Sequence, residues 1–357
     1  MARKILVPVL SRANYARLKS VLTEINNHPS LKLQLIVGAS AIVDRYGCIN
    51  TITKDGFEID AEVHGLVDGD EPECMAITTG LLTVQLTSLF KQLNPDMVFV
   101  HADRFEQMAT AIAASYTNRI LVHSEGGEST GSIDNKVRPS ITALADIHFP
   151  VTELAKQNII KMGKNPDTVF VVGSPALDII KEIDLTNTRE EPYLLALVHP
   201  NTTDPEGLEP LIEALMSIPL QKVFVNSNTD SGAKALMKKI HGLRDVEILK
   251  NLPPEEFARL LYNCECAVGN SSSFIKEGAF FGTGAVIVGT RQMGREHGRN
   301  VRFVPNCADS IRLMIREMMG RKFPRDYRFG DGTAGAKIAE VLSEIQTREK
   351  KLCLSSA

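Results

Sequence analysis

Residues 97–123 read MVFVHADRFEQMATAIAASYTNRILVH, and this stretch contains the pattern that decides the fold. Two apolar runs, MVFVH at 97–101 and ILVH at 120–123, flank a segment with helical spacing of its apolar residues at 107–114. Uninterrupted apolar runs of this length are typical of parallel strands that helices cover on both faces. The stretch therefore predicts a strand, a helix and a second, parallel strand.

The same alternation extends along the rest of the chain. In the first half it predicts strands at 4–9, 33–37 and 169–173, and helices at 15–26 and 79–92. The polar stretch 184–192 carries no apolar periodicity and is the predicted linker. After it come predicted strands at 193–198, 222–226, 246–249, 266–268 and 285–288, and predicted helices at 208–217, 232–241, 254–262, 274–281 and 333–348.

A length of 357 residues corresponds to about two domains of ~150 residues each. We therefore predict an α/β protein of two Rossmann-like lobes that face a cleft. Residues 1–183 would form the first lobe, 184–332 the second, and 333–357 a final helix and tail. In open α/β sheets ligands bind beyond the carboxyl ends of the strands, so the loops at those ends are the candidate sites.

Composition restricts the function classes. The 40 Lys and Arg residues nearly balance the 43 Asp and Glu residues, which argues against a dedicated nucleic-acid-binding surface. No uncharged apolar segment reaches the ~18 residues of a membrane span, and the N-terminal residues lack the features of a signal peptide. None of the six cysteines forms a CxxC pair. We expect a cytoplasmic protein with reduced thiols and no metal.

Four loops at predicted strand ends carry ionisable side chains. Arg12 follows the first strand, Asp103 follows MVFVH, Glu125 and Asp134 follow ILVH, and His199 follows the first strand of the second lobe. Taken singly, Asp103 is more often a helix cap, Asp134 a turn residue and His199 an ordinary loop histidine. Glu125 precedes two glycines, which is harder to explain as a cap. Together the three carboxylates and His199 suggest an acid/base centre in the cleft.

A second candidate segment is GNSSS at 269–273, which ends a strand and begins a helix. Ser271 and Ser272 suit a phosphate or diphosphate at a helix N-terminus, although a single serine cap is the simpler alternative. Glu277 lies about one turn further on, where a carboxylate can accept hydrogen bonds from a ribose. Arg291 can bind a diphosphate or belong to a solvated loop. With neither GxGxxG nor GxxxxGKS present, we expect no cofactor.

These motifs resemble the hydrolysing UDP-N-acetylglucosamine 2-epimerases of sialic-acid and related nonulosonic-acid biosynthesis. The resemblance extends from residue 4 to about residue 304. It rests on SRANY at 11–15, ADRF at 102–105, EGGE at 125–128 with GSID at 131–134, GNSS at 269–272, and Glu277 followed by GTRQMGRE at 289–296.

The resemblance implies a GT-B fold whose last helix crosses back to the first lobe. It implies elimination of the nucleotide through a glycal and release of a free 2-epimeric sugar such as N-acetylmannosamine, without a cofactor. By their matching positions the implied catalytic residues are Asp103, Glu125, Asp134 and His199, and the implied nucleotide or diphosphate ligands are Arg12, Ser271, Ser272, Glu277 and Arg291.

We favour Glu125 as a proton-transfer group. If Asp103 and Glu125 face one reacting centre, their charges should repel and raise the pKa of one of them. That would let one act as an acid while the other stays a base.

Departures from the family pattern at Asn14, Arg17, Ala41 and Pro139 leave the sugar and the nucleotide, UDP or GDP, open. The alternatives are a non-hydrolysing epimerase, which typically has Arg-Pro-Glu after the first strand, a GT-B glycosyltransferase, and a sugar-nucleotide binding protein. We expect a nucleotide-sugar substrate, no nucleic-acid or membrane partner, and a homodimer or homotetramer.

Overall fold

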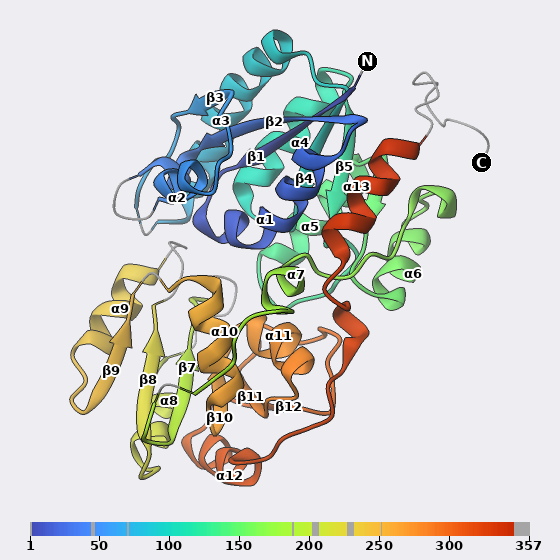
Figure 1. The fold of residues 1–357 in the computed structure, drawn as a ribbon. Coiled ribbons are helices and arrows are strands. Elements are labelled where there is room, and N and C mark those ends of the chain that lie inside the picture. The colour runs from blue at the N-terminus through green and yellow to red at the C-terminus, as the bar shows by residue number, and fades with distance from the viewer. Residues whose placement is uncertain are drawn as a thin grey trace.

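The chain folds into two lobes, each built on a six-stranded, all-parallel sheet (Figure 1). The computed structural model describes residues 2–43, 47–69, 71–187, 189–201, 207–226, 232–250 and 252–345. Helices lie on both faces of each sheet, and the lobes are stacked with the carboxyl ends of their strands toward the region between them. This is the GT-B arrangement, as the sequence indicates.

The first sheet has the strand order β3-β2-β1-β4-β5-β6. Its strands are β1 (Arg3–Val9), β2 (Leu31–Gly38), β3 (Ala61–Val63), β4 (Met97–His101), β5 (Ile120–Ser124) and β6 (Ile147–Phe149). Side chains alternate across the sheet, so Ile5 and Val7 join the core on one face and Leu6 joins the core on the other.

The helices of this lobe fill those two cores. One face is covered by α1 (Arg12–Asn27) and α2 (Ile49–Lys54), and the other by α3 (Pro72–Leu93), α4 (Phe105–Tyr116) and α5 (Asp134–Leu144). α6 (Glu153–Lys161) and α7 (Ala176–Ile180) follow before the second sheet begins.

The second sheet has the order β12-β11-β10-β7-β8-β9. Its strands are β7 (Tyr193–Leu197), β8 (Gln221–Val225), β9 (Val246–Leu249), β10 (Cys266–Gly269), β11 (Ala285–Val288) and β12 (Val301–Val304). α10 (Pro254–Asn263) and α11 (Ser273–Phe281) pack on one face, and α8 (Glu209–Met216), α9 (Ala233–His241) and α12 (Ala308–Met318) on the other. α7 also packs into this lobe through Leu177 and Ile180.

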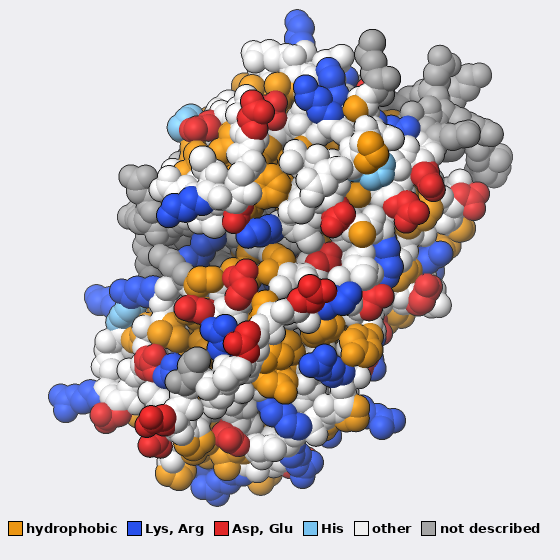
Figure 2. Space-filling model, in the orientation of Figure 1, with side chains coloured by type: hydrophobic (Ala, Val, Ile, Leu, Met, Phe, Trp, Pro, Cys, Tyr) orange, Lys and Arg blue, Asp and Glu red, His pale blue; other side chains and the backbone are white. Residues whose placement is uncertain are grey.

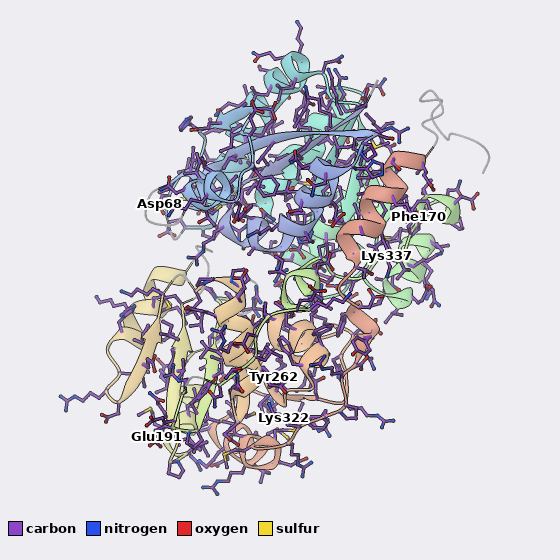
Figure 3. All side chains as sticks on the ribbon, viewed as in Figure 1. Asp68, Phe170, Glu191, Tyr262, Lys322 and Lys337 are labelled. Carbon is purple, nitrogen blue, oxygen red and sulfur yellow. The ribbon has the colours of Figure 1, made fainter. Side chains whose placement is uncertain are left out.

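The chain returns to the first lobe after α12. The Lys322 ammonium lies 5.0 Å from the ring centre of Tyr262 and fastens the returning segment to α10 (both are labelled in Figure 3). α13 (Ala334–Glu344) then packs against α1, with Ile338 and Leu342 buried in the core of the first lobe (Figure 1). The expected crossing back is confirmed.

Most predicted elements are present, and β4, β9 and β11 have the predicted bounds. The strand predicted at 169–173 is wrong: only Val169 forms a single bridge, to His148, and the following residues run irregularly toward α7. β3, β6 and β12 were not predicted; β3 and β6 have only three residues each, which is too short for a clear apolar run. α5 was not predicted, and it contains Pro139. Residues 346–348 lie outside the described residues, and the lobe limits stay a prediction.

α3 differs from the other helices in its surface. Among the described residues it is the one helix with the length and apolar composition of a membrane span, which by itself is weak evidence for one. Leu82 and Leu86 are buried against the sheet, whereas Ile77 and Val84 on the same helix are 52% and 70% exposed. α3 therefore covers the core with one face and presents apolar side chains on another.

Gly127 fixes the loop after β5 against α6. Its φ is +83°, and an added Cβ would lie 2.2 Å from the Ala155 carbonyl oxygen. Gly163 has a similar φ of +88° with nothing within 4 Å of an added Cβ. Both glycines therefore have a left-handed backbone, and Gly127 differs from Gly163 in the close approach of a neighbouring carbonyl.

Gly163→Ala is expected to lower the free energy of unfolding by about 1–2 kcal/mol, the cost of a left-handed alanine. Gly127→Ala should cost about 2–5 kcal/mol, because overpacking adds to that strain. Urea unfolding of both variants measures the difference. Equal shifts of the two midpoints would show that the Ala155 contact is unimportant.

Candidate active site

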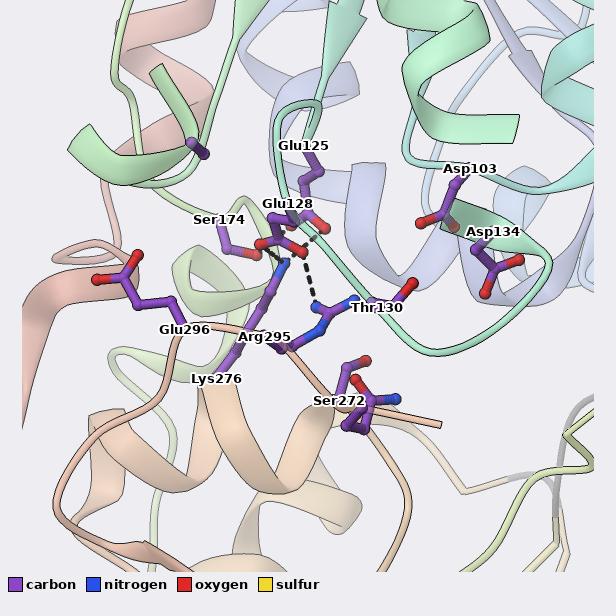
Figure 4. Close-up of polar contacts among 12 residues, drawn as sticks. Asp103, Glu125, Glu128, Thr130, Asp134, Ser174, Ser272, Lys276, Arg295 and Glu296 are labelled. Atoms are coloured by element: carbon purple, nitrogen blue, oxygen red, sulfur yellow. Dashed lines mark hydrogen bonds and ion pairs between the residues drawn. The ribbon is translucent and has the colours of Figure 1, made fainter. Parts of the chain in front are cut away.

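A cluster of four buried charges joins the two lobes. Glu125 and Glu128 come from the loop after β5, while Lys276 lies on α11 and Arg295 follows β11 (Figure 4). The Lys276 Nζ lies 2.9 Å from Glu125 Oε2 and 2.8 Å from Glu128 Oε1. The Arg295 Nη1 lies 2.7 Å from Glu128 Oε2. Each side chain is less than 10% exposed, so these pairs are shielded from solvent.

Glu125 is held in place from three directions. Its φ of +61° is unusual for a residue with a side chain, and such strain persists where the surrounding structure fixes it. The Ser174 hydroxyl donates to Oε1 at 2.5 Å, and Arg17 lies 3.8 Å from Oε2. Burial would raise the pKa of Glu125, but the Lys276 ammonium and the other nearby charges outweigh burial, so its pKa lies well below the usual value.

Glu128 is also held as a carboxylate. Burial would raise its pKa, but Arg295 and Lys276 more than compensate and the pKa is lowered. The sequence motif contained Glu128 without giving it a role. The importance of Lys276 and Arg295 for the cluster was not predicted, because no local pattern marks a lysine or arginine that pairs across a cleft.

Asp103 lies beside a fully buried arginine. Arg138, on α5 and 1% exposed, donates to the Asp103 carboxylate and to the Glu128 carbonyl oxygen. Burial would raise the pKa of Asp103, but Arg138 and Arg295 outweigh it, and the pKa is lowered. Arg138 therefore fixes Asp103 as an anion.

Asp134, the first residue of α5, behaves differently (Figure 4 shows it beside Asp103). Burial and the Asp103 charge raise its pKa to about 6, against the opposing effects of Arg291 and of the Ser132 hydroxyl, which donates at 2.8 Å. Asp134 is thus the carboxylate of this site that changes protonation near neutral pH.

The expectation that Asp103 and Glu125 would raise the pKa of one of them is wrong. Both are paired with buried cations, and the pKa of each is lowered. The raised pKa belongs to Asp134 instead. Paired cations from other elements decided this outcome, and the spacing of carboxylates in the sequence does not reveal them.

His199 lies at the end of β7, in the second lobe. It is 8% exposed, and its backbone N–H donates to the Asn270 side chain at 2.7 Å, while the Asn270 amide donates back to the His199 carbonyl at 2.8 Å. These bonds fix the loops after β7 and β10 side by side. Residues 202–204, which complete the predicted loop, lie outside the described residues.

The predicted nucleotide residues gather where α11 approaches α1. Ser272 precedes α11 and accepts from Arg17 Nη2 at 3.2 Å across the lobes. Ser271 is buried and accepts from the Ser273 N–H at 3.3 Å. Glu277 is 9% exposed on α11.

The two arginines predicted to bind the diphosphate lie in different lobes, Arg12 in the first and Arg291 in the second. Arg12 begins α1, and burial lowers its pKa. Arg291 donates to the Asn270 carbonyl at 3.0 Å, and its own carbonyl accepts from the Gly131 N–H, also at 3.0 Å, which joins the lobes a second time. The roles of these residues toward a ligand stay predictions.

A recess lies further along the first sheet, at the carboxyl ends of β2, β3 and β4. Polar residues Ser40, Asp68 and Arg104 share its lining with apolar ones such as Leu66 and Phe105 (Asp68 is labelled in Figure 3). Arg104 directly follows Asp103, which places the recess on the side of Asp103 away from β5.

Comparison with known protein families decides the assignment. The model of the UDP-N-acetylglucosamine 2-epimerase family matches residues 23–343, which is most of the chain. The chain belongs to this family. It is therefore similar in sequence to enzymes that act on nucleotide sugars, and the two-lobed fold with a cleft agrees with that class.

Individual relatives support the family assignment over nearly the full length. The UDP-N,N'-diacetylbacillosamine 2-epimerase (hydrolyzing) of Legionella pneumophila is 32% identical over 364 residues, 97% of each chain. The UDP-N-acetylglucosamine 2-epimerase of Neisseria meningitidis is 28% identical and covers 97% of this chain and 96% of its own. The chain is thus an epimerase of nucleotide sugars.

The fold is shared with solved structures. The Methanocaldococcus jannaschii UDP-GlcNAc 2-epimerase in complex with UDP-GlcNAc and UDP superimposes with a TM-score of 0.80 at 16% identity, covering 96% of this chain and 99% of that chain. Within the residues that the structure describes, no group of three or more His, Cys, Asp or Glu side chains could hold a metal ion.

Arg138→Met is expected to lower the free energy of unfolding by about 3–5 kcal/mol, because it leaves the buried Asp103 charge unpaired. The exposed pair of Lys337 and Asp331 provides a control, since Lys337→Met should cost at most about 1 kcal/mol. Denaturant unfolding measures both. The paired Asp103 has a lowered pKa and stabilises the fold above its unfolded pKa of about 3.9, so the Arg138 effect should shrink as the pH falls below about 3.9 toward the lowered pKa of the folded state.

A loss of less than 1 kcal/mol for Arg138→Met at neutral pH would show that Asp103 does not depend on this arginine.

Proposed function

We propose that the enzyme is a hydrolysing 2-epimerase of a nucleotide-diphospho-2-acetamido sugar. The observation that carries the proposal is the difference among the three carboxylates: Asp134 has a pKa of about 6, while Asp103 and Glu125 are fixed as anions. Removing a weakly acidic proton from carbon needs a base with a tuned pKa in a charged, buried site. The named activity of the Legionella relative supports the hydrolysing subtype.

In the proposed reaction Asp134 takes the proton from sugar carbon 2. The electron pair of that C–H bond forms the double bond between carbons 1 and 2, and the bond from carbon 1 to the diphosphate oxygen breaks. The nucleoside diphosphate leaves, and a glycal remains. Water then adds its hydroxyl to carbon 1, while carbon 2 regains a proton on the opposite face. The products are the nucleoside diphosphate and the free 2-epimeric sugar.

The other residues have distinct parts in this proposal. The Glu125 and Asp103 carboxylates stabilise the positive charge that develops at carbon 1 as the diphosphate leaves. Arg12, Arg17 and Arg291 balance the charge of the leaving diphosphate. We propose the remaining roles by position: Ser271, Ser272 and Glu277 bind the nucleotide, and His199 approaches the reacting sugar from the second lobe.

We propose that the sugar extends from Asp103 into the recess lined by Ser40, Asp68 and Arg104. A second acetamido group, as in the substrate named for the Legionella relative, has apolar and polar parts that match this lining. N-Acetylglucosamine is the smaller alternative, and the nucleotide is UDP or GDP.

A non-hydrolysing epimerase is the second candidate, because the name of the Neisseria relative, UDP-N-acetylglucosamine 2-epimerase, does not specify hydrolysis, and that relative matches 97% of the chain. It would return an epimerised nucleotide sugar rather than a free sugar. The two candidates therefore differ in their products.

We further propose a cytoplasmic homodimer or homotetramer. The exposed Ile77 and Val84 of α3 provide apolar surface for an association between copies. Lysine, arginine, aspartate and glutamate side chains are mixed over the face drawn in Figure 2, and that face offers no continuous basic surface for a nucleic acid.

Incubation with UDP-N-acetylglucosamine and UDP- and GDP-linked diacetamido sugars, each deuterated at carbon 2, tests the proposal. We expect one of them to give free nucleoside diphosphate and free 2-epimeric sugar in equal amounts, with deuterium lost to solvent. EDTA should leave the rate unchanged. An epimerised nucleotide sugar would identify the non-hydrolysing enzyme, and nucleotide release only with an added acceptor would identify a transferase.

Asp134→Asn is expected to lower turnover and deuterium loss by about 10²–10⁴-fold, because the variant has no titrating base. In the unmodified enzyme turnover should fall as the pH drops below about 6, where Asp134 becomes protonated. Ser132→Ala removes a hydrogen bond that lowers the Asp134 pKa, so the acid limb of its pH profile should move to higher pH.

If Asp134→Asn still exchanged carbon-2 deuterium at the original rate, Asp134 would not be the base, and Glu125→Gln would be the next variant to measure.

A further inference from the structure

Lys276 is a buried lysine whose ammonium pairs with two carboxylates of the opposite lobe. The residue is 2% exposed on α11, in the second lobe. Its ammonium contacts the carboxylates of Glu125 and Glu128, at 2.9 and 2.8 Å, and both belong to the loop after β5 in the first lobe (Figure 4). Both carboxylate partners thus lie in the first lobe, and the lysine lies in the second.

A lysine in this position is costly unless it is paired. Burying an ammonium without a partner costs several kcal/mol, and removing one member of a buried pair leaves the other uncompensated. Separation of the lobes would expose Lys276 and leave Glu125 and Glu128 as neighbouring carboxylates on one loop. The contacts thus favour the arrangement in which the lobes meet.

The same helix also carries the proposed nucleotide residues. Glu277 is the next residue along α11, and successive helix residues point about 100° apart, so one helix turn can serve the nucleotide and the interlobe carboxylates at once. Arg17 makes a parallel connection, because it contacts both Glu125 and Ser272. The position of α11 is therefore tied to both halves of the site.

We propose that Lys276 is a positioning residue that fixes the Glu125 carboxylate at the reacting sugar and fastens the two lobes together through its paired contacts with Glu125 and Glu128. This inference rests on the proposed function for its effect on turnover, but its effect on lobe closure is independent of it. Lys276 acts through Glu125 and does not itself touch the reacting atoms.

Lys276 also affects how the site responds to pH. Without Lys276, Glu125 and Glu128 repel each other, so the pKa of one of them rises and it takes up a proton at a higher pH. The charged and titratable groups that face the two carboxylates are Lys276, Arg17 and His101 around Glu125, and Lys276, Arg295 and Arg138 around Glu128. The remaining arginines reduce the repulsion and do not replace the ammonium between the two carboxylates.

Lys276→Met, which keeps the length of the side chain and removes its charge, tests the inference in the full-length protein. Turnover at saturating nucleotide sugar should fall about 10²-fold or more, as expected for breaking a buried pair. UDP affinity by calorimetry should change less than about threefold, because Lys276 contacts carboxylates of the first lobe and Glu277, the next residue on α11, points about 100° away from it. The acid limb of the pH profile, which Asp134 alone sets in the unmodified enzyme, should become steeper below about pH 6, because a second carboxylate then takes up a proton as well.

Solution scattering provides a readout that needs no turnover. With UDP bound, Lys276→Met should have a larger radius of gyration than the unmodified protein. Lys276→Arg restores the charge and should recover at least tenfold of the lost turnover together with the original acid limb. Lys239→Met is the control. It removes an exposed ion pair with a similar N–O distance, 2.8 Å from Lys239 Nζ to Glu209 Oε1, and should leave every readout unchanged. If Lys276→Met does not fold, Lys276→Gln takes its place with the same readouts.

An unchanged acid limb and an unchanged scattering profile in the Met variant would overturn the inference. So would an equal loss of turnover, UDP affinity and thermal stability without recovery in Lys276→Arg, since that pattern indicates a purely structural lysine. An unmodified protein that binds UDP but releases no sugar from any substrate would contradict the proposed function alone, because the scattering comparison would still report on Lys276.

Discussion

The ion pairs between Lys276 and the Glu125 and Glu128 carboxylates are the constraint on which the rest of the site depends. Charges buried between two lobes are tolerable only when they are compensated there, so the position of each lobe is set by the charges on the other. The Arg295–Glu128 pair completes the compensation at 2.7 Å. The same ion pairs therefore fix both the relative position of the lobes and the charges between them, and a bound substrate has to fit both.

This constraint assigns different properties to chemically similar residues. Lys276 fixes Glu125 as an anion and Arg138 does the same for Asp103, whereas Asp134 is buried near the Asp103 charge and its pKa rises to about 6. A carboxylate with a higher pKa is the stronger base, so the environment rather than the residue type selects the proton-transfer group. Family membership gives the class of substrate. The ion pairs show which carboxylates of this chain are held as anions and which one has a raised pKa.

Much of the fold could be predicted because its cause is local. Residues 97–100 are all apolar, as in a parallel strand covered on both faces, and the structure places β4 at 97–101 with all its residues buried, His101 included. Prediction failed where local and tertiary preferences diverge. Residues 169–173 are apolar enough for a strand, but after the single bridge at Val169 the chain turns toward α7 and the second lobe. β6 has only three residues and is a strand because β5 lies next to it.

The sequence by itself determined which loops lie at the carboxyl edge of each sheet, because parallel strands deliver the residues that follow them to one edge. Asp103, Glu125 and His199 were identifiable on that basis. Only the tertiary structure decided which charges meet. Lys276 and Glu125 are 151 residues apart in the chain, and their contact exists because the two lobes face each other. Since the energy of a charge depends on distance and burial, the ionisation of each carboxylate is a property of the assembled cleft rather than of any segment of the sequence.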